Sequence, residues 1–451
     1  MNQHMNQIVR FIQCTSYEDI PDKAIKNAKQ AFTDTLAVSI AALETENADI
    51  LHEVFLEYYD NGSMLSVIQR GRKDDAAFVW GALTHILDFD DVNFTFQGHP
   101  SVALIPIIMV LGKEKNLTGK QMLLAYAVGF EVQARIGEAI GSEQYNLGNH
   151  TTSTVGIFGA IAAACNILRF NELQIKHAFG MASSLAAGSR KNFGTKTKPL
   201  HVGFLSRNVY WILKLVEKGI DATDDIFNEP IPIDLLTTGQ HLNKQSIKKL
   251  GETWELETFG VITKKYPCCA YTHRSIDALF NIQADHEIEL DKLEKIEAIV
   301  HYKVPAVLIY PKASTALEGK FSMQYCLAAA LTDSGVNLDT FTDEMINREN
   351  VQKVMRKVQM SIDPAQKAGT NPKEQAATIK VYVNGEVYTS TVCYPKGHPV
   401  NPFNDEEMFL KFKSCVQYAY PTDRIQAFYN DLMQIEEMDY QVIAEHINEM
   451  N

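Results

Sequence analysis

The sequence predicts a mostly α-helical protein that carries a smaller α+β unit. The first 220 residues show helical periodicity and no convincing strand. After about residue 260, strand-like segments stand among helical ones, as expected for an α+β unit inserted in, or following, a helical domain. With 451 residues the chain is too long for one ordinary hydrophobic core, so we expect two domains.

Apolar residues at helical spacing define the elements of the first half. Pro21 suits the first turn of a helix over residues 21–43, whose apolar stripe is Ile25, Ala28, Phe32, Leu36 and Ile40. The Gly- and Ala-rich residues 151–168 indicate a helix that packs closely on its neighbours. Further helices are expected over 75–88 with Asp75 as N-cap, 101–114 with Ser101 as cap, 121–140, 172–187 and 203–218.

Strand signals appear only in the second half. Residues 296–304 alternate between apolar and polar, and 378–383 and 386–392 flank Asn384-Gly385, a strong hairpin signal. Helical patterns at 274–285 and 319–333 stand among these strands. From about residue 405 the chain is helical again, and we expect these last helices to pack on the first domain.

Composition excludes several functional classes. A net charge of −13 argues against a general nucleic-acid-binding protein, which needs a basic surface. Seven scattered cysteines do not suggest a disulfide framework, and the vicinal pair Cys268-Cys269 lacks the C-x-x-C spacing of zinc sites. The first residues lack the layout of a signal peptide, and no apolar run reaches the roughly 18 residues of a membrane span. We therefore expect a cytoplasmic protein without a metal, a membrane or a nucleic acid as partner.

The densest group of reactive side chains lies in residues 85–101, HILDFDDVNFTFQGHPS. This stretch places carboxylates and imidazoles among apolar residues: His85, Asp88, Asp90, Asp91 and His99. Charged groups in such surroundings are usually paired or functional. An acid and an imidazole held at helix ends around a loop suit proton transfer. The alternative is a solvated acidic loop between two core helices.

A basic region follows, in a chain that is acidic overall. Residues 173–216 contain no Asp or Glu but seven cationic residues: Lys176, Arg190, Lys191, Lys196, Lys198, Arg207 and Lys214. A cleft lined in this way concentrates anionic small molecules. Gly188, Gly194 and Gly203 would let the backbone approach a ligand, and His201 adds an imidazole. A basic surface loop is the alternative.

Three shorter stretches add further candidate groups. KKYPCCAYTH (264–273) combines lysines with a histidine, and YPKASTALEGKF (310–321) places a tyrosine and two lysines before a helix. His150, in NHTT (149–152), stands near a helix N-terminus, where backbone N–H groups attract anions. Each histidine alone is more often structural than catalytic. Together these groups have neither metal-ligand spacing nor a nucleotide-binding loop.

The ordered motifs HILDFDD, GHPS, GNHTTSTVGIFGA, KNFGTKTKPLHVG, KKYPCCAYTH and EGKFSMQYCLAAAL resemble those of the MmgE/PrpD family. The resemblance covers nearly the whole chain. That family includes 2-methylcitrate dehydratase, cis-aconitate decarboxylase and iminodisuccinate epimerase. It implies an all-helical domain of residues 1–261 and 397–451, an α+β lid domain of residues 262–396, and a homodimer. It also implies activity on a small anionic polycarboxylate without a metal or organic cofactor.

Carried over by motif, the resemblance implies a catalytic set of Asp88, His99, His150, Lys198, Lys264 and Tyr310. Residues within or beside these motifs are assigned to substrate binding: Asp91, Lys196, His201, Cys269 and His273. We assign the two lysines of the catalytic set to substrate carboxylates and to the negative charge that develops on proton removal. Asp88 or His150 is the candidate base, His99 the candidate acid for a leaving hydroxyl, and Tyr310 closes the pocket or donates a proton.

Two positions depart from the decarboxylase pattern of the family. Cys269 stands where those decarboxylases have a histidine, and Val92 where they have a threonine after DFDD. We therefore expect a hydro-lyase similar to 2-methylcitrate dehydratase, with an epimerase of the iminodisuccinate type or a cis-aconitate decarboxylase as alternatives. From other classes, a non-catalytic polycarboxylate-binding protein and a structural dimer without a ligand stay open.

Overall fold

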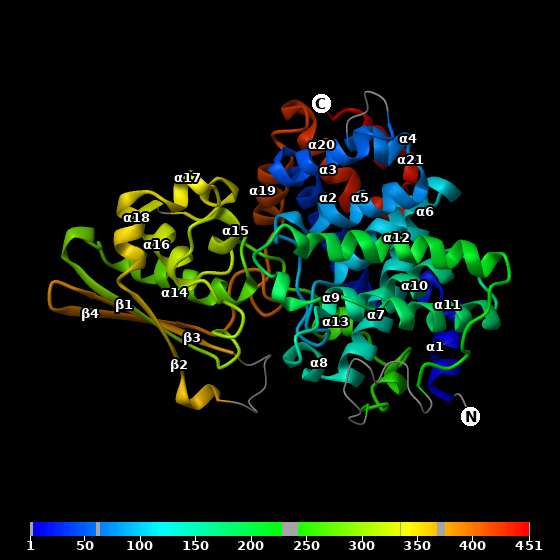
Figure 1. Ribbon diagram of the computed structural model, residues 1–451, viewed down its shortest axis with the longest axis horizontal. Helices are drawn as coiled ribbons and strands as arrows, with labels where there is room; N and C mark the ends of the chain where they lie inside the picture. Colours follow the sequence, from blue (N-terminus) through cyan, green and yellow to red (C-terminus); the bar gives the residue numbers. More distant parts are fainter. Residues whose placement is uncertain (1–2, 60–63, 228–241, 334, 368–374, 451) are drawn as a thin grey trace. The chain divides into compact units, whose positions relative to one another are not determined.

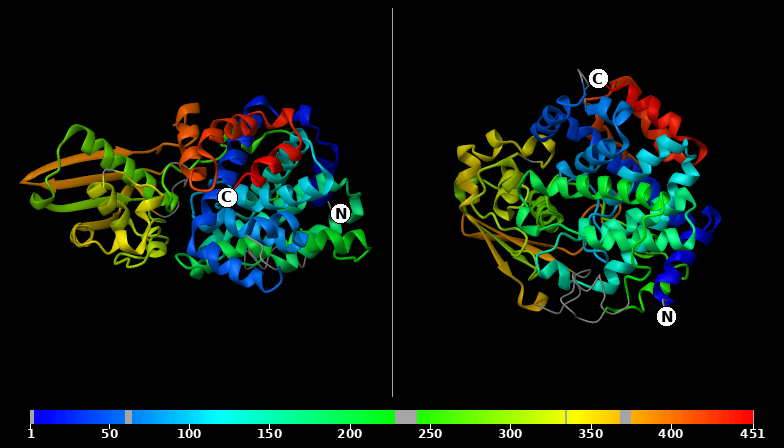
Figure 2. Two further views of the ribbon diagram at one scale, coloured as in Figure 1. Left: turned by 90° about the horizontal axis from the view of Figure 1, so that it is seen from above. Right: turned by 45° about the vertical axis from the view of Figure 1, so that its right-hand side comes forward.

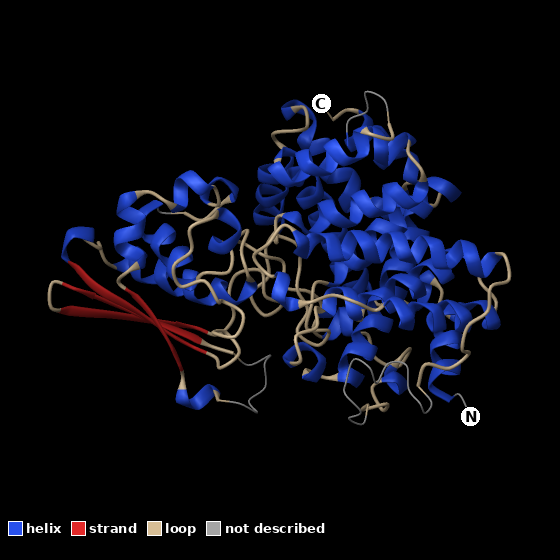
Figure 3. Ribbon diagram, viewed as in Figure 1, coloured by secondary structure: helices blue, strands red, loops and turns tan. Residues whose placement is uncertain are grey.

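The computed structural model describes residues 3–59, 64–227, 242–333, 335–367 and 375–450. The chain forms two compact units (Figure 1). Unit 1 contains Met1–Asn192, Thr197–Val261 and Asn404–Asn451, and unit 2 contains Phe193–Lys196 and Ile262–Phe403. Helices dominate, and one four-stranded sheet lies in unit 2, which confirms the predicted fold class (Figure 3).

Unit 1 is helical throughout its described residues, where pairing between extended segments is limited to isolated bridges. Its helices are α1 (Gln3–Cys14), α2 (Asp22–Ala41), α3 (Glu46–Leu56), α4 (Met64–Arg70), α5 (Lys73–Ile86), α6 (Pro100–Lys115), α7 (Gly119–Ile140), α8 (Glu143–Asn146), α9 (Thr151–Thr154), α10 (Gly156–Leu168), α11 (Glu172–Leu185), α12 (Thr197–Glu217), α13 (Glu255–Thr258), α19 (Asp405–Val416), α20 (Ile425–Met433) and α21 (Tyr440–Asn448).

Glycines allow the central helices of unit 1 to pack closely. A Cβ on Gly81 of α5 would lie 2.6 Å from the carbonyl oxygen of Val202 on α12, and one on Gly203 would lie 2.9 Å from that of Phe78. Neither position tolerates a side chain, so the two helices cross with their backbones in contact. This crossing brings the N-terminal turns of α12 beside the C-terminal end of α5, where the acidic loop begins.

The C-terminal helices return to the N-terminal part of the chain, as the sequence suggested. Both views of Figure 2 show the orange and red helices beside the blue ones, and α19 and α20 pack on α2. A buried ion pair holds α19 on α2, because Lys411 of α19 lies 2.6 Å from Asp34 of α2. The same ammonium donates to the carbonyl oxygen of Phe89, 3.1 Å away, and so also supports the acidic loop.

Several predicted helix ends are wrong. Asp75 is not an N-cap: α5 begins at Lys73, and Asp75 accepts a hydrogen bond from Tyr59 Oη at 2.6 Å. Ser101 is not a cap either, since α6 begins at Pro100 and His99 occupies the N-cap position. The predicted helix over 203–218 begins six residues earlier, at Thr197, because Pro199 fits within the first turn of a helix.

The apolar segment Thr151–Leu168 corrects another expectation. By length and composition it meets the criteria for a membrane-crossing helix, although no run of that length was expected. However, 89% of the segment is buried inside the protein, as in the core helix of a globular domain. Two helices, α9 and α10, share it, with a break at Val155.

Unit 2 consists of a sheet and the helices that pack on it. The strand order is β2-β1-β3-β4, with β1 (Leu293–Val300) parallel to β2 (Val358–Ile362) and antiparallel to β3 (Ala377–Val383). β3 and β4 (Glu386–Val392) form the predicted hairpin, and both turn residues have positive φ, 52° at Asn384 and 79° at Gly385. β2 was not predicted.

The helices of unit 2 lie on one side of this sheet (Figure 3). They are α14 (Ala270–Asp285), α15 (Ala316–Gly319), α16 (Met323–Asp333), α17 (Asp343–Ile346) and α18 (Glu349–Met355). α14 packs against β3 and β4, and α16 packs against β2. The inward residues of β3 are fully or nearly fully buried, at alternate positions from Ala377 to Val383, as the period of a strand requires.

Candidate functional site

The loop between α5 and α6 is buried and begins with a strained residue. Asp88 has φ 51°, the left-handed conformation that a non-glycine residue adopts only when its surroundings enforce it. Asn93 closes the loop by pairing with Gly98, and its side-chain amide donates to the carbonyl oxygen of Gly260 at 2.7 Å. These hydrogen bonds let an acidic segment lie within the protein, so the alternative of a solvated acidic loop is wrong.

A buried ion pair joins this loop to α12. Lys198 Nζ lies 2.6 Å from Asp88 Oδ1, and both side chains are about 95% shielded from solvent, with exposed fractions of 4% and 5%. His99 Nε2 lies 3.6 Å from the same carboxylate oxygen. Three of the residues in the predicted catalytic set therefore meet at one point of unit 1.

Asp90 connects two imidazoles beside this pair. Its Oδ1 lies 3.0 Å from Nδ1 of His85, and its Oδ2 lies 2.6 Å from Nδ1 of His99. The side chains of His85 and Asp90 are 0% exposed, whereas that of His99 is 14% exposed. Asp90 and His85 were not among the predicted site residues, although both belong to the HILDFDD motif that pointed to the site.

Two further imidazoles continue the cluster. His150, which precedes α9 as predicted, lies with its Nδ1 3.0 Å from Nδ1 of His201 on α12. Its ring stacks on that of His85, with centroids 5.6 Å apart and planes inclined by 17°. Burial, reinforced by the positive charge of Lys198, lowers the pKa of both His150 and His201. The neutral form of both imidazoles is therefore favoured.

Asp91 faces away from the imidazoles. Its carboxyl group accepts hydrogen bonds from the backbone N–H and the hydroxyl of Ser101, and that hydroxyl lies 2.7 Å from Tyr126 Oη. Burial raises the pKa of Asp91 to about 8. Its assignment to substrate binding stays a prediction, and its visible role is to hold the first turn of α6.

Four residues of the loop region could hold a metal ion by their spacing. One ligand atom from each of His85, Asp88, Asp90 and His99 lies within 4.8 Å of the others. Lys198 already supplies a cation to Asp88 at 2.6 Å. A divalent ion at this place would have to displace or repel that ammonium, so the geometry favours the protein's own cation.

Unit 2 holds the remaining candidates. Lys264 is fully buried, and Cys269 occupies the N-cap position of α14. His273 Nε2 lies 3.3 Å from the carbonyl oxygen of Cys268. Tyr310 donates from its hydroxyl to the carbonyl oxygen of Phe193 at 2.9 Å. Lys196, in the short segment of unit 2 that precedes α12, is exposed.

The basic region proves to be partly neutralised. Lys214 lies 2.9 Å from Glu114, and Lys176 lies 2.6 Å from Glu172, one residue before the acid-free stretch begins. Residues 197–202, which the predicted helix over 203–218 did not include, belong to α12. The three glycines approach protein atoms rather than leaving space for a ligand: a Cβ on Gly188 would meet Ser153, one on Gly194 Tyr310, and one on Gly203 Phe78.

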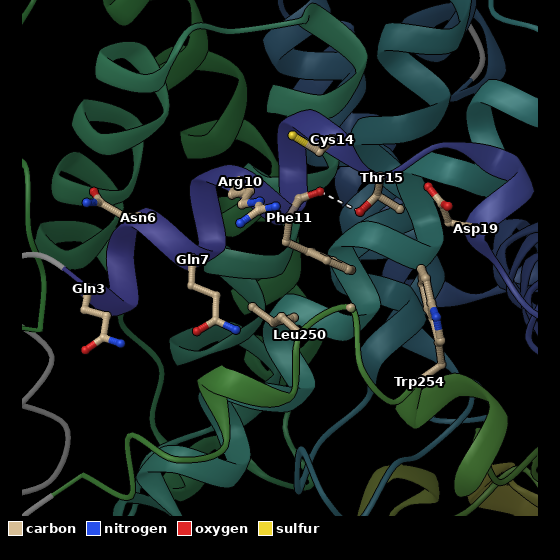
Figure 4. A pocket seen from close by; sticks show the side chains of 11 residues that line it. Gln3, Asn6, Gln7, Arg10, Phe11, Cys14, Thr15, Asp19, Leu250 and Trp254 are labelled. Carbon is tan, nitrogen blue, oxygen red and sulfur yellow. Dashed lines mark hydrogen bonds between the residues drawn. The ribbon is translucent and has the colours of Figure 1, made fainter.

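A separate pocket of about 740 Å³ lies along α1 (Figure 4). Arg10, Phe11 and Trp254 contribute to its lining, together with amide side chains of α1. None of the predicted site residues lines it. Proton-transfer chemistry is therefore more reasonably placed at the acidic loop, where carboxylates, imidazoles and an ammonium are in contact.

The chain matches known proteins along most of its length. Residues 6–240 match the MmgE/PrpD N-terminal domain, and residues 266–433 match the MmgE/PrpD C-terminal domain. It is 26% identical over 442 residues to the cis-aconitate decarboxylase of Homo sapiens, in an alignment that covers 93% of this chain and 89% of that relative. It is 23% identical over 449 residues to the cis-aconitate decarboxylase of Aspergillus terreus, covering 93% and 91%. The two domain matches together span most of the chain, which belongs to the MmgE/PrpD family.

Proposed function

We propose that this protein is a lyase that acts on a small polycarboxylate by moving a proton at a carbon next to a carboxylate. The observation that carries the proposal is the buried Asp88–Lys198 pair with His99 beside it. A C–H group next to a carboxylate is a weak acid. Removing its proton needs a positioned base, and a nearby cation to stabilise the negative charge that develops. The cluster in unit 1 has both kinds of group in a water-poor environment.

Within this proposal, each group has a role that follows from its charge. Lys198 attracts a substrate carboxylate and stabilises the enolate-like charge. Asp88 or the neutral His150 accepts the proton, and His99 returns one to the leaving group or to carbon. Lys264 and Tyr310, which belong to unit 2, keep the catalytic assignment that the motif resemblance implies.

Two reactions fit a site that stabilises negative charge on a carbon next to a carboxylate. Loss of water begins with removal of a proton from that carbon, whereas loss of CO₂ leaves the electron pair on carbon, which then takes up a proton. Loss of water, as in 2-methylcitrate dehydration, is supported by Val92 and Cys269, which depart from the decarboxylase pattern of the family. Loss of CO₂ is supported by the relatives, which are named as cis-aconitate decarboxylases at 23–26% identity. We place water loss first and CO₂ loss second. An epimerase needs the same proton transfer without a leaving group.

The test is product analysis. The protein is incubated with 2-methylcitrate, citrate, cis-aconitate and iminodisuccinate, and the products are followed by ¹H NMR. We expect a new vinyl signal from a hydroxy-tricarboxylate, and the Lys198→Ala protein serves as the control. Itaconate-type products from cis-aconitate would establish the second candidate instead.

Two outcomes would contradict the proposal. Thermal stabilisation by a polycarboxylate without conversion of any would indicate a binding protein, because a ligand that binds only the native state raises apparent stability. Neither stabilisation nor conversion would indicate a structural role. The homodimer and the cytoplasmic location stay predictions, and light scattering tests the first of them.

A further inference from the structure

Asp90 is in contact with both imidazoles that flank the Asp88–Lys198 pair. One carboxylate oxygen lies 3.0 Å from Nδ1 of His85, and the other lies 2.6 Å from Nδ1 of His99. The rings of His85 and His99 also meet edge to face, with centroids 4.5 Å apart. The two histidines are thus held against each other and against one shared carboxylate.

This arrangement fixes the protonation of the rings. An ionised carboxylate can only accept hydrogen bonds, so the Nδ1 atom of His85, which is hydrogen-bonded to it, must carry a proton. At His99 the contact is an ion-pair distance of 2.6 Å, which is attractive only if Nδ1 carries a proton. In a neutral ring the lone pair then lies on Nε2. For His99, Nε2 is the atom that points toward Asp88, at 3.6 Å from Oδ1. Asp90 therefore determines which nitrogen of His99 can exchange a proton near the ion pair.

Burial excludes a direct role for Asp90. The side chain of Asp90 and that of His85 are 0% exposed, whereas His99 retains 14% exposure. A substrate can reach His99 but not the carboxylate behind it. Burial also lowers the pKa of His85 to about 3, so this imidazole stays neutral and serves Asp90 as a hydrogen-bond donor.

We propose that Asp90 is a positioning residue, anchored by His85, that holds His99 with Nε2 directed at the reacting proton. The inference rests on the proposed function, because it assigns how the proton-transfer group of that site is oriented. Neither Asp90 nor His85 belongs to the set that the family motifs suggested. Some residues orient a functional histidine by contacting its second ring nitrogen. Substituting such a residue commonly lowers activity 10- to 100-fold or more.

The kinetic test is Asp90→Asn. Asparagine has nearly the same shape but offers one acceptor oxygen and one N–H₂ donor, so it can accept from only one of the two imidazoles. We expect kcat to fall about 100-fold with KM within about threefold, and the pH profile of kcat/KM to shift. A merely structural role would not move the pH profile of the folded variant.

Asp431→Asn is the matched control. Asp431 also contacts a histidine, His446, at 2.7 Å, and it lies in the same unit but outside the site. We expect kcat of this variant to equal that of the unchanged protein. If Asp90→Asn is folded and keeps both its kcat and its pH profile, the inference is wrong.

A second measurement needs no activity and no variant of Asp90. In the unchanged protein labelled with ¹⁵N-histidine, and with the His99 signals identified by their loss in His99→Gln, we expect His99 to carry its proton on Nδ1. A proton fixed on Nε2 in the neutral ring would overturn the inference. If the protein converts none of the polycarboxylates, the proposed function fails, whereas this tautomer still decides whether Asp90 positions His99.

Discussion

The two sides of the acidic loop show how imidazole partners and hydroxyl partners shift the pKa of adjacent carboxyl groups in opposite directions. Asp90 and Asp91 follow each other in the chain, and both are 0% exposed. Asp90 faces the imidazole side, formed by His85 and His99. Asp91 faces the hydroxyl side, formed by Ser101 and Tyr126.

The consequence appears in the pKa values. Burial alone raises the pKa of any carboxyl group, because it disfavours the charge. At Asp90 the contacts with His85 and His99 outweigh that effect and bring the pKa well below its usual value. At Asp91 the hydrogen bonds from Ser101 do not outweigh burial, and the pKa rises to about 8. The imidazole side therefore holds a charge that can orient groups, whereas the hydroxyl side holds a proton.

This difference teaches that burial does not by itself mark a functional carboxyl group. The kind of partner separates a carboxylate that contacts imidazoles from a carboxyl group that supports a helix. The contrast between the two sides can be tested by three changes. They concern Lys198 on the imidazole side, Lys411, which contacts the loop from α19, and Asp91 on the hydroxyl side.

The largest effect is expected from Lys198→Ala on the imidazole side. This change removes the cation 2.6 Å from Asp88, so turnover of the polycarboxylate substrate should fall at least about 100-fold. His150→Ala should cause a loss of the same order, because it removes a neutral imidazole from the cluster. Steady-state kinetics on the substrate found by product analysis measures both effects.

Lys214→Ala is the control for the lysine change. Lys214 lies on the same helix and pairs with Glu114 at 2.9 Å on a partly exposed surface, so its loss should leave turnover unchanged. Circular dichroism should show that all three variants keep their helices. Near-normal turnover in both Lys198→Ala and His150→Ala would refute the site.

The contacts of Lys411 with Asp34 and with the acidic loop should affect stability rather than turnover alone. Lys411→Met removes the cation 2.6 Å from the buried carboxylate of Asp34 and the donor to the carbonyl oxygen of Phe89, which precedes Asp90. Breaking a buried ion pair on one side typically costs about 3–5 kcal/mol. Urea denaturation should therefore show a lower midpoint with an unchanged slope.

The double variant Asp34→Leu with Lys411→Met provides the comparison. Replacing both charges by apolar side chains also removes the buried charge of Asp34, so most of the lost stability should return. If Lys411→Met alone is as stable as the unchanged protein, the pair does not anchor α19 on α2. The loop would then need another source of support.

Local patterns in the sequence were sufficient for much of this fold. The hairpin at Asn384-Gly385 was predicted because these two residues readily adopt the positive φ that a two-residue hairpin turn requires. The residues 85–101 were singled out because carboxylates and imidazoles rarely stand in an apolar segment without a reason. Asp88, His99 and Lys198 were predicted together only through the family motifs, since 110 residues separate the ion pair in the chain.

The roles of the neighbouring aspartates could not be predicted in the same way. DFDD presents three acids of equal chemistry, and the partner that each one faces depends on how α5, α6 and α12 pack. That packing depends on the contact of Gly81 with Val202 and Gly203, which no local pattern encodes. The start of α12 at Thr197 was missed because polar and basic residues there suggested a loop.

The smallest expected effect concerns the hydroxyl side and takes the form of a pH dependence. Between about pH 4 and pH 8, the folded protein keeps a proton on Asp91 that the unfolded chain releases, so the free energy of unfolding falls as pH rises. Asp91→Asn keeps similar hydrogen bonds but cannot titrate. Its stability should therefore decrease less between pH 5 and pH 8, by roughly 1 kcal/mol or more.

Urea denaturation of both proteins at the two pH values measures this difference. Burial also raises the pKa of Glu131, to about 7, so this group contributes a decrease of the same sign in both proteins and cancels in the comparison. An equal loss of stability in Asp91→Asn and the unchanged protein would mean that Asp91 is ionised in the folded state. The two sides of the loop would then be alike in charge, and the contrast between them would have to lie in hydrogen-bond geometry alone.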